Sequence, residues 1–173
     1  MSRVYGPDNA KLTVRTKRTG AASKAGHDLL IEVTSWSAVL DPDADPALRL
    51  MADSSSLRVL EGTGGMQELD DEDKAGIEKT IDEEVLTGTA IEFRSSVVEL
   101  GADGSGTVKG ELELAGRRHP VNVELTSAED GRLMGTATIR QSDWGMKPYS
   151  ALFGTLKVAD ELEVGFETAA HDV

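Results

Sequence analysis

The feature that most constrains this chain is the alternation of apolar and polar residues along most of its length. In the clearest example, small or apolar residues occupy the even positions from Val108 to Leu114, and Lys109, Glu111 and Glu113 occupy the odd ones. A period of two is typical of a β-strand with one dry and one solvated face. The chain is therefore predicted to be mainly β, with dry faces that cover a shared interior.

The same alternation predicts strands over residues 11–15, 29–40, 48–51, 57–60, 91–95, 107–114, 121–125, 133–141 and 162–166. In the longest of them, Leu29, Ile31, Val33 and Val39 are predicted to share one side. About eight antiparallel strands joined by turns favour a barrel or a sandwich, and we prefer a single closed sheet. No linker or internal repeat interrupts the series, so residues 1–173 are predicted to form one domain.

One segment, from Asp70 to Leu86, breaks the β pattern. Acidic residues cluster at its start, and Ile77, Ile81 and Val85 follow at a spacing of four. This arrangement predicts an amphipathic helix over about residues 70–86, whose positive end is met by carboxylates. We expect its apolar stripe to pack over one end or flank of the barrel.

Charge and cysteine content exclude several function classes. The chain has 18 Lys and Arg against 31 Asp and Glu, a net charge of −13, so its surface repels nucleic-acid phosphates. The absence of cysteine excludes thiolate catalysis and Cys-ligated metals. No signal-peptide pattern and no apolar run near the ~20 residues of a membrane span are present, which predicts a cytoplasmic protein without integral membrane association. The composition leaves a monomer and a homodimer open.

The polar motifs indicate turns rather than cofactor sites. Asp41 to Pro46 begins like an EF-hand loop, but Pro46 replaces the required glycine and Ala52 the bidentate glutamate. Gly62 to Gly65 lacks the Gly-Lys-Ser/Thr ending of a phosphate-binding loop. The three histidines lie far apart in the sequence and form no metal-binding pair. We predict no cofactor and no metal.

Three short motifs, in this order, resemble the YceI-like family. They are Gly26-His27-Asp28-Leu29, the hairpin from Gly110 to Val121, and Ser142-Asp143-Trp144-Gly145. The resemblance extends from about Leu12 to Phe166 and departs from the family where Gln141 displaces the arginine expected before the Ser-Asp pair. It implies an extended antiparallel lipocalin-like barrel that binds a polyisoprenoid or other long amphiphilic lipid in its lumen, for sequestration or transport. It implies no catalytic step.

The inward parity of the predicted strands and the resemblance together suggest ligand-binding residues. The predicted set comprises Phe93, Leu112, Leu114, Val121, Val123 and Ile139 as lining, with Trp144, Tyr149 and Phe153 near an opening. Small barrels can instead be filled by such side chains, which would favour a stress-related interaction module that docks through its acidic helix. A third hypothesis is an enzyme for a hydrophobic substrate that uses His27 and Asp143 as a proton-transfer pair.

Overall fold

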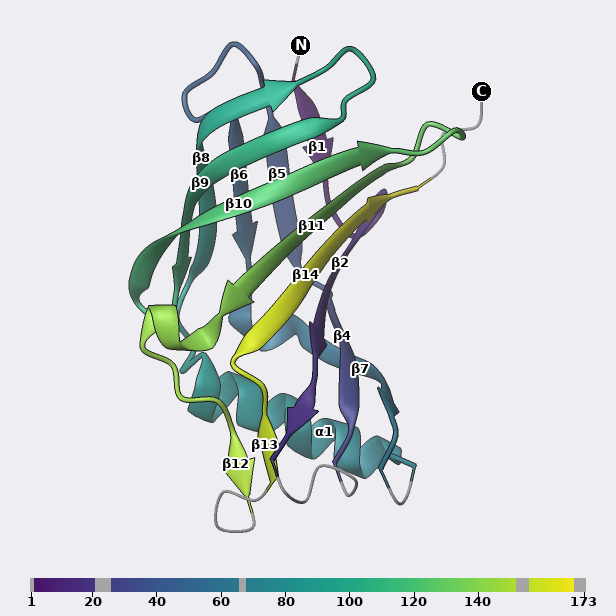
Figure 1. Cartoon of the computed structure of the whole chain (residues 1–173), viewed down its shortest axis with the longest axis vertical. Helices are drawn as coiled ribbons and strands as arrows, with labels where there is room; N and C mark the ends of the chain where they lie inside the picture. Colours follow the sequence, from purple (N-terminus) through teal and green to yellow (C-terminus); the bar gives the residue numbers. More distant parts are fainter. Residues whose placement is uncertain (1, 21–25, 66–67, 152–155, 170–173) are drawn as a thin grey trace.

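A curled antiparallel sheet forms most of the protein. The structure is a computed structural model and describes residues 2–20, 26–65, 68–151 and 156–169. Within these ranges the sheet has eleven strands that curve around a central space (Figure 1). Their order is β1 (Arg3–Tyr5), β5 (Trp36–Leu40), β6 (Leu48–Ala52), β8 (Ile91–Leu100), β9 (Gly106–Leu114), β10 (Arg117–Ser127), β11 (Leu133–Arg140), β14 (Glu161–Thr168), β2 (Ala10–Thr16), β4 (Asp28–Val33) and β7 (Leu57–Thr63). The predicted fold class is confirmed, with eleven strands where about eight were expected.

The extra strands arise because two long segments bend. The predicted strand 29–40 divides into β4 and β5 at Thr34 and Ser35, and the 3-10 turn η2 (Ser54–Ser56) separates β6 from β7. Hydrogen bonds from Thr34 N to Ser56 O (2.9 Å) and from Asp53 N to Ser35 O (3.0 Å) join the two bends. The sheet order ends at β1 and β7, so these strands are edges and the sheet curls without closing. The preference for a single closed sheet was therefore wrong, because the bends at Thr34–Ser35 and η2 continue the sheet through the chain and leave β1 and β7 unpaired with each other.

The bend also reverses which parity faces inward. Ile31 and Val33 are buried in β4, but Trp36, Ala38 and Leu40 are buried in β5. Val39 was predicted on the side of Ile31 and is instead 42% exposed. The prediction for Val39 was wrong because the successive inward residues Val33 and Trp36 lie three positions apart across the bend, where regular alternation would place them two apart.

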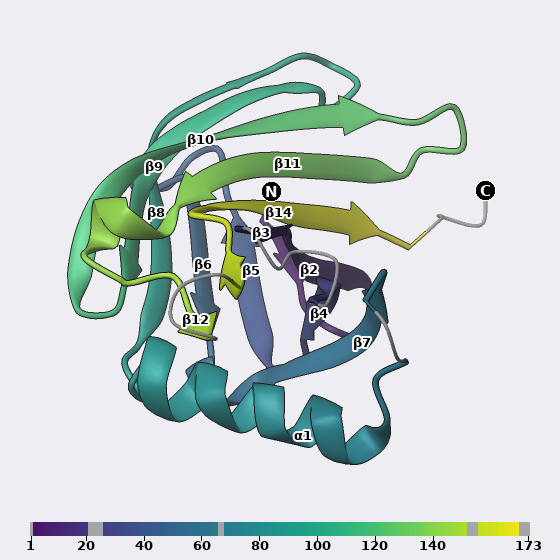
Figure 2. The same ribbon diagram turned by 60° about the horizontal axis from the view of Figure 1, so that its bottom comes forward.

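The predicted helix is present as α1 (Asp71–Thr80), followed by a π-helical turn, η3 (Ile81–Val85). Asp70 caps it: its carboxylate accepts from Asp73 N at 2.7 Å, and Asp73 in turn accepts from Asp70 N at 3.2 Å. This capping box satisfies amide groups that a helix start leaves without partners. The helix lies across one end of the curled sheet, beside β7 (Figures 1 and 2).

A small second sheet lies at the same end. It consists of β12 (Ser150–Ala151), β13 (Leu156–Val158) and β3 (Arg18–Thr19) (Figures 1 and 2). β12 and β13 follow the short 3-10 turn η4 (Gln141–Trp144) in the chain, whereas β3 comes from the N-terminal part. No helix in the described part of the chain is long and apolar enough to cross a membrane.

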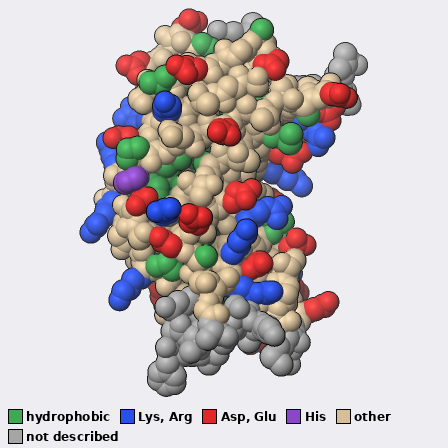
Figure 3. Space-filling model, in the orientation of Figure 1, with side chains coloured by type: hydrophobic (Ala, Val, Ile, Leu, Met, Phe, Trp, Pro, Cys, Tyr) green, Lys and Arg blue, Asp and Glu red, His purple; other side chains and the backbone are tan. Residues whose placement is uncertain are grey.

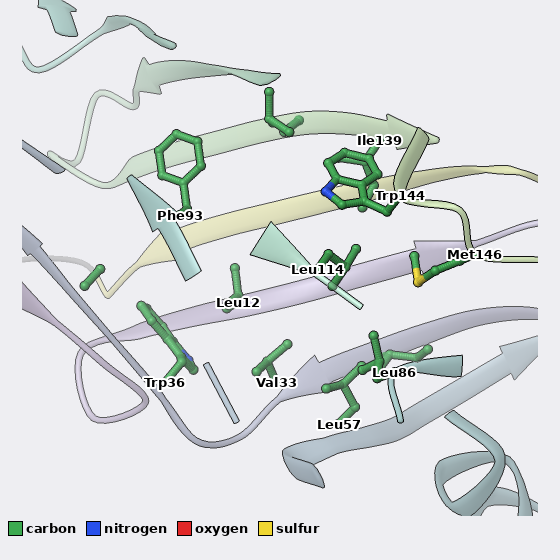
Figure 4. Packing of buried hydrophobic residues seen from close by; sticks show 14 of the residues in the cluster. Leu12, Val33, Trp36, Leu57, Leu86, Phe93, Leu114, Ile139, Trp144 and Met146 are labelled. Carbon is green, nitrogen blue, oxygen red and sulfur yellow. The ribbon is translucent and has the colours of Figure 1, made fainter. Parts of the chain in front are cut away.

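The two faces of the large sheet differ sharply in polarity. The inner face carries the buried apolar side chains, several of which converge in Figure 4. On the outer face shown in Figure 3, acidic and basic side chains are interspersed. Some of them form ion pairs. Arg132 Nη1, just before β11, lies 2.7 Å from Glu167 Oε1 of β14, and Arg140 Nη2 of β11 lies 3.3 Å from Glu161 Oε1 of β14. The exposed pairs contribute little to stability, so the fold depends mainly on the inner face.

Candidate ligand cavity

The inner face of the sheet encloses a cavity of about 720 Å³. Strands from every part of the sheet supply its wall, and α1 and η3 cover one end with Ile77, Ile81 and Val85. These helical side chains are half-buried and pack against the buried apolar cluster at this end of the cavity. The volume lies within the range typical of small-molecule sites. The interior of the sheet is therefore not filled by its own side chains.

Most of the predicted ligand-binding residues line this cavity. Those on its wall are Phe93, Leu112, Leu114, Val121, Val123, Ile139 and Tyr149. Trp144 lies outside the wall, and Phe153 lies outside the described residues. Whether the lining residues contact a ligand stays a prediction, although their placement is as expected from alternation.

Sequence reasoning missed a large share of the wall. Leu12, Ile31, Val33 and Ala38 line the cavity from strands whose alternation was recognised but whose side chains were not assigned to the site. The signal that could have found the first three is the same inward parity. The helical residues Ile77 and Ile81 were expected to pack over the barrel, and their spacing of four did indicate the face that points to it.

Of the predicted proton-transfer pair, His27 lies on the cavity wall and Asp143 does not. His27 lines the cavity at the end covered by α1 and directly precedes β4. Asp143 is exposed in η4, after β11, and is not on the cavity wall. In the sheet, β14 and β2 separate β11 from β4. The structure does not bring these two residues together in one site.

Electrostatic features outside the cavity belong to exposed turns. Hydrogen bonds from Ser55 hold the pKa of Asp53 below its ordinary value, and hydrogen bonds from Ser105 lower the pKa of Asp103. The amide of Arg132 lowers the pKa of Asp130 in the same way. Among the described residues, no group of three or more Asp, Glu or His side chains is arranged to hold a metal ion.

Comparison with known proteins places this architecture in a family. A family model described as a YceI-like domain matches residues 67–170, which is more than half of the chain. This chain belongs to the YceI-like family. The match begins after β7, so the YceI-like signature lies in the segment from α1 onward rather than in the N-terminal strands.

Solved structures extend the likeness over nearly the whole chain. The crystal structure of Burkholderia cenocepacia BcnA has a TM-score of 0.60 at 17% identity, covering 92% of this chain and 94% of that one. A mutant YceI protein from Campylobacter jejuni, crystallised with a monobromobimane guest, has a TM-score of 0.51 at 15% identity, covering 83% and 85%. At these identities the likeness establishes the fold alone. No curated protein matches the sequence.

Two YceI-like motifs of the sequence meet in space. The indole Nε1 of Trp144 donates to the carbonyl of Leu112 at 2.8 Å, and the Trp144 ring meets His119 edge-on with centroids 5.2 Å apart. Gly110, at the start of the hairpin motif, leaves room for the Phe93 ring, whose Cζ would lie 2.7 Å from a Cβ at that position. These contacts give the motifs a structural role: they fix η4 against the β9–β10 hairpin and shape the cavity wall.

Proposed function

We propose that this protein binds a long-chain amphiphilic lipid of the polyisoprenoid class in its cavity, and so sequesters or transports it. The observation that carries the proposal is the cavity of about 720 Å³, whose wall consists mainly of Leu, Ile, Val and Phe side chains. Burial of hydrocarbon contributes about 0.8 kcal/mol per CH₂ group. A long chain can therefore bind tightly without a charged contact.

The ligand contacts in this proposal are the predicted residues that line the cavity. Phe93, Leu112 and Val121 belong to the strands β8, β9 and β10, and Ile139 faces the same interior from β11. Trp144 acts behind the wall, by holding Leu112 through its backbone carbonyl. We infer a binding protein rather than an enzyme, because the His27 and Asp143 side chains do not share the cavity wall.

Two further predictions accompany the proposal. We propose that residues 1–173 form one domain, since strands from both ends of the sequence pair in a single sheet. The cytoplasmic location and the choice between monomer and homodimer stay predictions from the sequence.

Native mass spectrometry of the purified protein, followed by organic extraction and lipid analysis, tests the function. We expect a stoichiometric adduct, or uptake of one added polyprenol per chain after delipidation. Ala137→Phe places a large ring in the cavity from β11 and should abolish uptake, whereas Thr138→Phe on the outward face of the same strand should not. Ala38→Phe offers a second blocking variant, on β5. A delipidated protein that takes up neither polyprenols nor other long-chain lipids would contradict the proposal.

A further inference from the structure

The cavity reaches the protein surface at the end covered by α1. Glu72, Asp73 and Gly76 of α1 are exposed and belong to the cavity wall. Tyr149, which directly precedes β12, also lines the cavity and is 50% exposed. Thr136 is exposed too, but it points outward from the middle of β11. The opposite end is lined by buried or half-buried leucines, namely Leu40, Leu48, Leu125 and Leu133.

Hydrogen bonds fasten one side of α1 to the edge strand β7. Glu78 Oε1 accepts from Val59 N at 2.9 Å, and Lys74 Nζ donates to the Leu60 carbonyl at 3.2 Å. Gly76 lies two positions from both Lys74 and Glu78, and two positions correspond to about 200° around an α-helix. Gly76 is therefore on the side of α1 that faces away from β7. Figures 1 and 2 both place β12 of the second sheet close to α1.

Neither backbone conformation nor packing requires a glycine at position 76. The residue lies inside α1, where glycine destabilises a helix relative to alanine. Outside the backbone of its own helix, no atom of the described residues lies within 4 Å of a Cβ built on Gly76. What distinguishes this glycine is that it leaves the rim of the cavity without a side chain.

We propose that Gly76 forms the portal of the cavity, so that the ligand enters and leaves between the Gly76 side of α1 and Tyr149. The inference rests on the lipid-binding function proposed above. Thr80 follows Gly76 by one turn on the same stripe of the wall, and its Oγ1 donates to the Gly76 carbonyl at 3.1 Å. That bond draws the hydroxyl back onto the helix. A larger side chain at position 76 would narrow the passage, and so control the rate of exchange rather than the affinity.

The exchange kinetics of retinol, an isoprenoid alcohol with intrinsic fluorescence, test the portal. Stopped-flow mixing with delipidated protein gives the association rate constant. Transfer from loaded protein to phosphatidylcholine vesicles, at vesicle concentrations where the rate no longer changes, gives the dissociation rate constant. We expect Gly76→Leu to lower both rate constants about tenfold, and because both fall by the same factor, to leave the Kd unchanged. Leucine favours the helix, so the variant should fold.

Two further variants separate a blocked passage from other effects. Ala75→Leu introduces the same side chain one residue earlier, at an exposed position outside the cavity wall, and should leave both rate constants unchanged. Gly76→Ala stiffens the helix but adds only a methyl group, so it should slow exchange much less than Gly76→Leu.

Three results would overturn the portal while lipid binding stands. They are unchanged rate constants in Gly76→Leu, a weaker Kd in that variant without slower association, and equal slowing in Gly76→Leu and Gly76→Ala. The last result would mean that the glycine acts through the flexibility of the helix. Failure of the unmodified protein to bind retinol or polyprenols would instead contradict the proposed function, and the portal with it.

Discussion

At the scale of single residues, the two tryptophans differ in whether the buried indole N–H has a hydrogen-bond acceptor. Trp144 is 1% exposed and its indole N–H donates to the Leu112 carbonyl. Trp36 is 6% exposed, and its Nε1 is buried without a hydrogen-bond partner among the described residues. Trp36 is instead held by its ring, which meets Phe166 edge-on at 6.0 Å between centroids. The polar atom therefore contributes to stability at one site and opposes it at the other.

Replacing each tryptophan by phenylalanine separates these contributions. Both variants lose a similar volume, but Trp144→Phe also leaves the Leu112 carbonyl without its donor, whereas Trp36→Phe removes an unpaired N–H. We expect Trp144→Phe to lower the free energy of unfolding by about 2–3 kcal/mol, and Trp36→Phe by about 1 kcal/mol less. Urea unfolding followed by circular dichroism measures both. Equal losses would show that the Trp144 hydrogen bond contributes nothing net.

At the scale of elements, the alternation of residues predicted most strands of the large sheet but not where a strand bends. From Leu29 to Leu40 apolar residues occur at both parities, so the pattern does not reveal that the inward side changes between Val33 and Trp36. The change is made by Thr34, whose Oγ1 and N both donate to the Ser56 carbonyl, at 2.7 and 2.9 Å. That contact joins residues far apart in the sequence, and periodicity carries no information about it.

Side chains of the helix α1 form hydrogen bonds to the backbone of the edge strand β7, a role that residue spacing could not predict. β7 is an edge strand, and α1 supplies partners to it: Glu78 Oε1 accepts from Val59 N at 2.9 Å, and Lys74 Nζ donates to the Leu60 carbonyl at 3.2 Å. Side chains of the helix thus satisfy backbone groups that an edge strand leaves open. From the sequence alone, the acidic residues of this segment had suggested only a favourable charge at the start of the helix or, alternatively, a docking surface.

Removing the Glu78 carboxylate should therefore loosen the edge of the sheet. In Glu78→Ala the Val59 amide loses its acceptor, and we expect its hydrogen-exchange rate to rise about tenfold or more, as measured by NMR under native conditions. Glu83→Ala is the matched control, because Glu83 is exposed and no contact to β7 is seen for it in the described part of the chain. An unchanged Val59 rate would mean that α1 protects β7 by apolar packing alone.

At the scale of the whole molecule, the sequence predicted which face of each strand points inward, but not whether those faces enclose an empty cavity. The inward residues of β11, Gly135, Ala137 and Ile139, are small or medium in size, and that pattern was compatible both with a lumen and with bulky side chains opposite. Whether the interior is an open lumen or a filled core depends on the distance between opposite walls of the curled sheet. It also depends on which side chains face one another across the interior. Phe93 and Ile139, for example, line the same cavity from strands that are not neighbours in the sheet. Local spacing cannot supply such long-range distances.

The enclosed volume also connects stability to binding. An open cavity forfeits van der Waals contacts that a filled core would make, so the delipidated protein should be less stable than the loaded one. A ligand that binds only the folded state at a hundred times its Kd adds about 2.7 kcal/mol. For a chain of this length that corresponds to a rise in Tm of about 5–10 °C, measurable by differential scanning calorimetry.

The same measurement on the blocking variants distinguishes binding in the cavity from binding at the surface. In Ala137→Phe the added ring occupies the space of the ligand, so the Tm should not respond to lipid. In Thr138→Phe the ring points outward and the shift should equal that of the unmodified protein. If lipid raised the Tm of all three proteins by the same amount, the stabilising lipid would bind outside the curled sheet. That result would contradict lipid binding in the cavity.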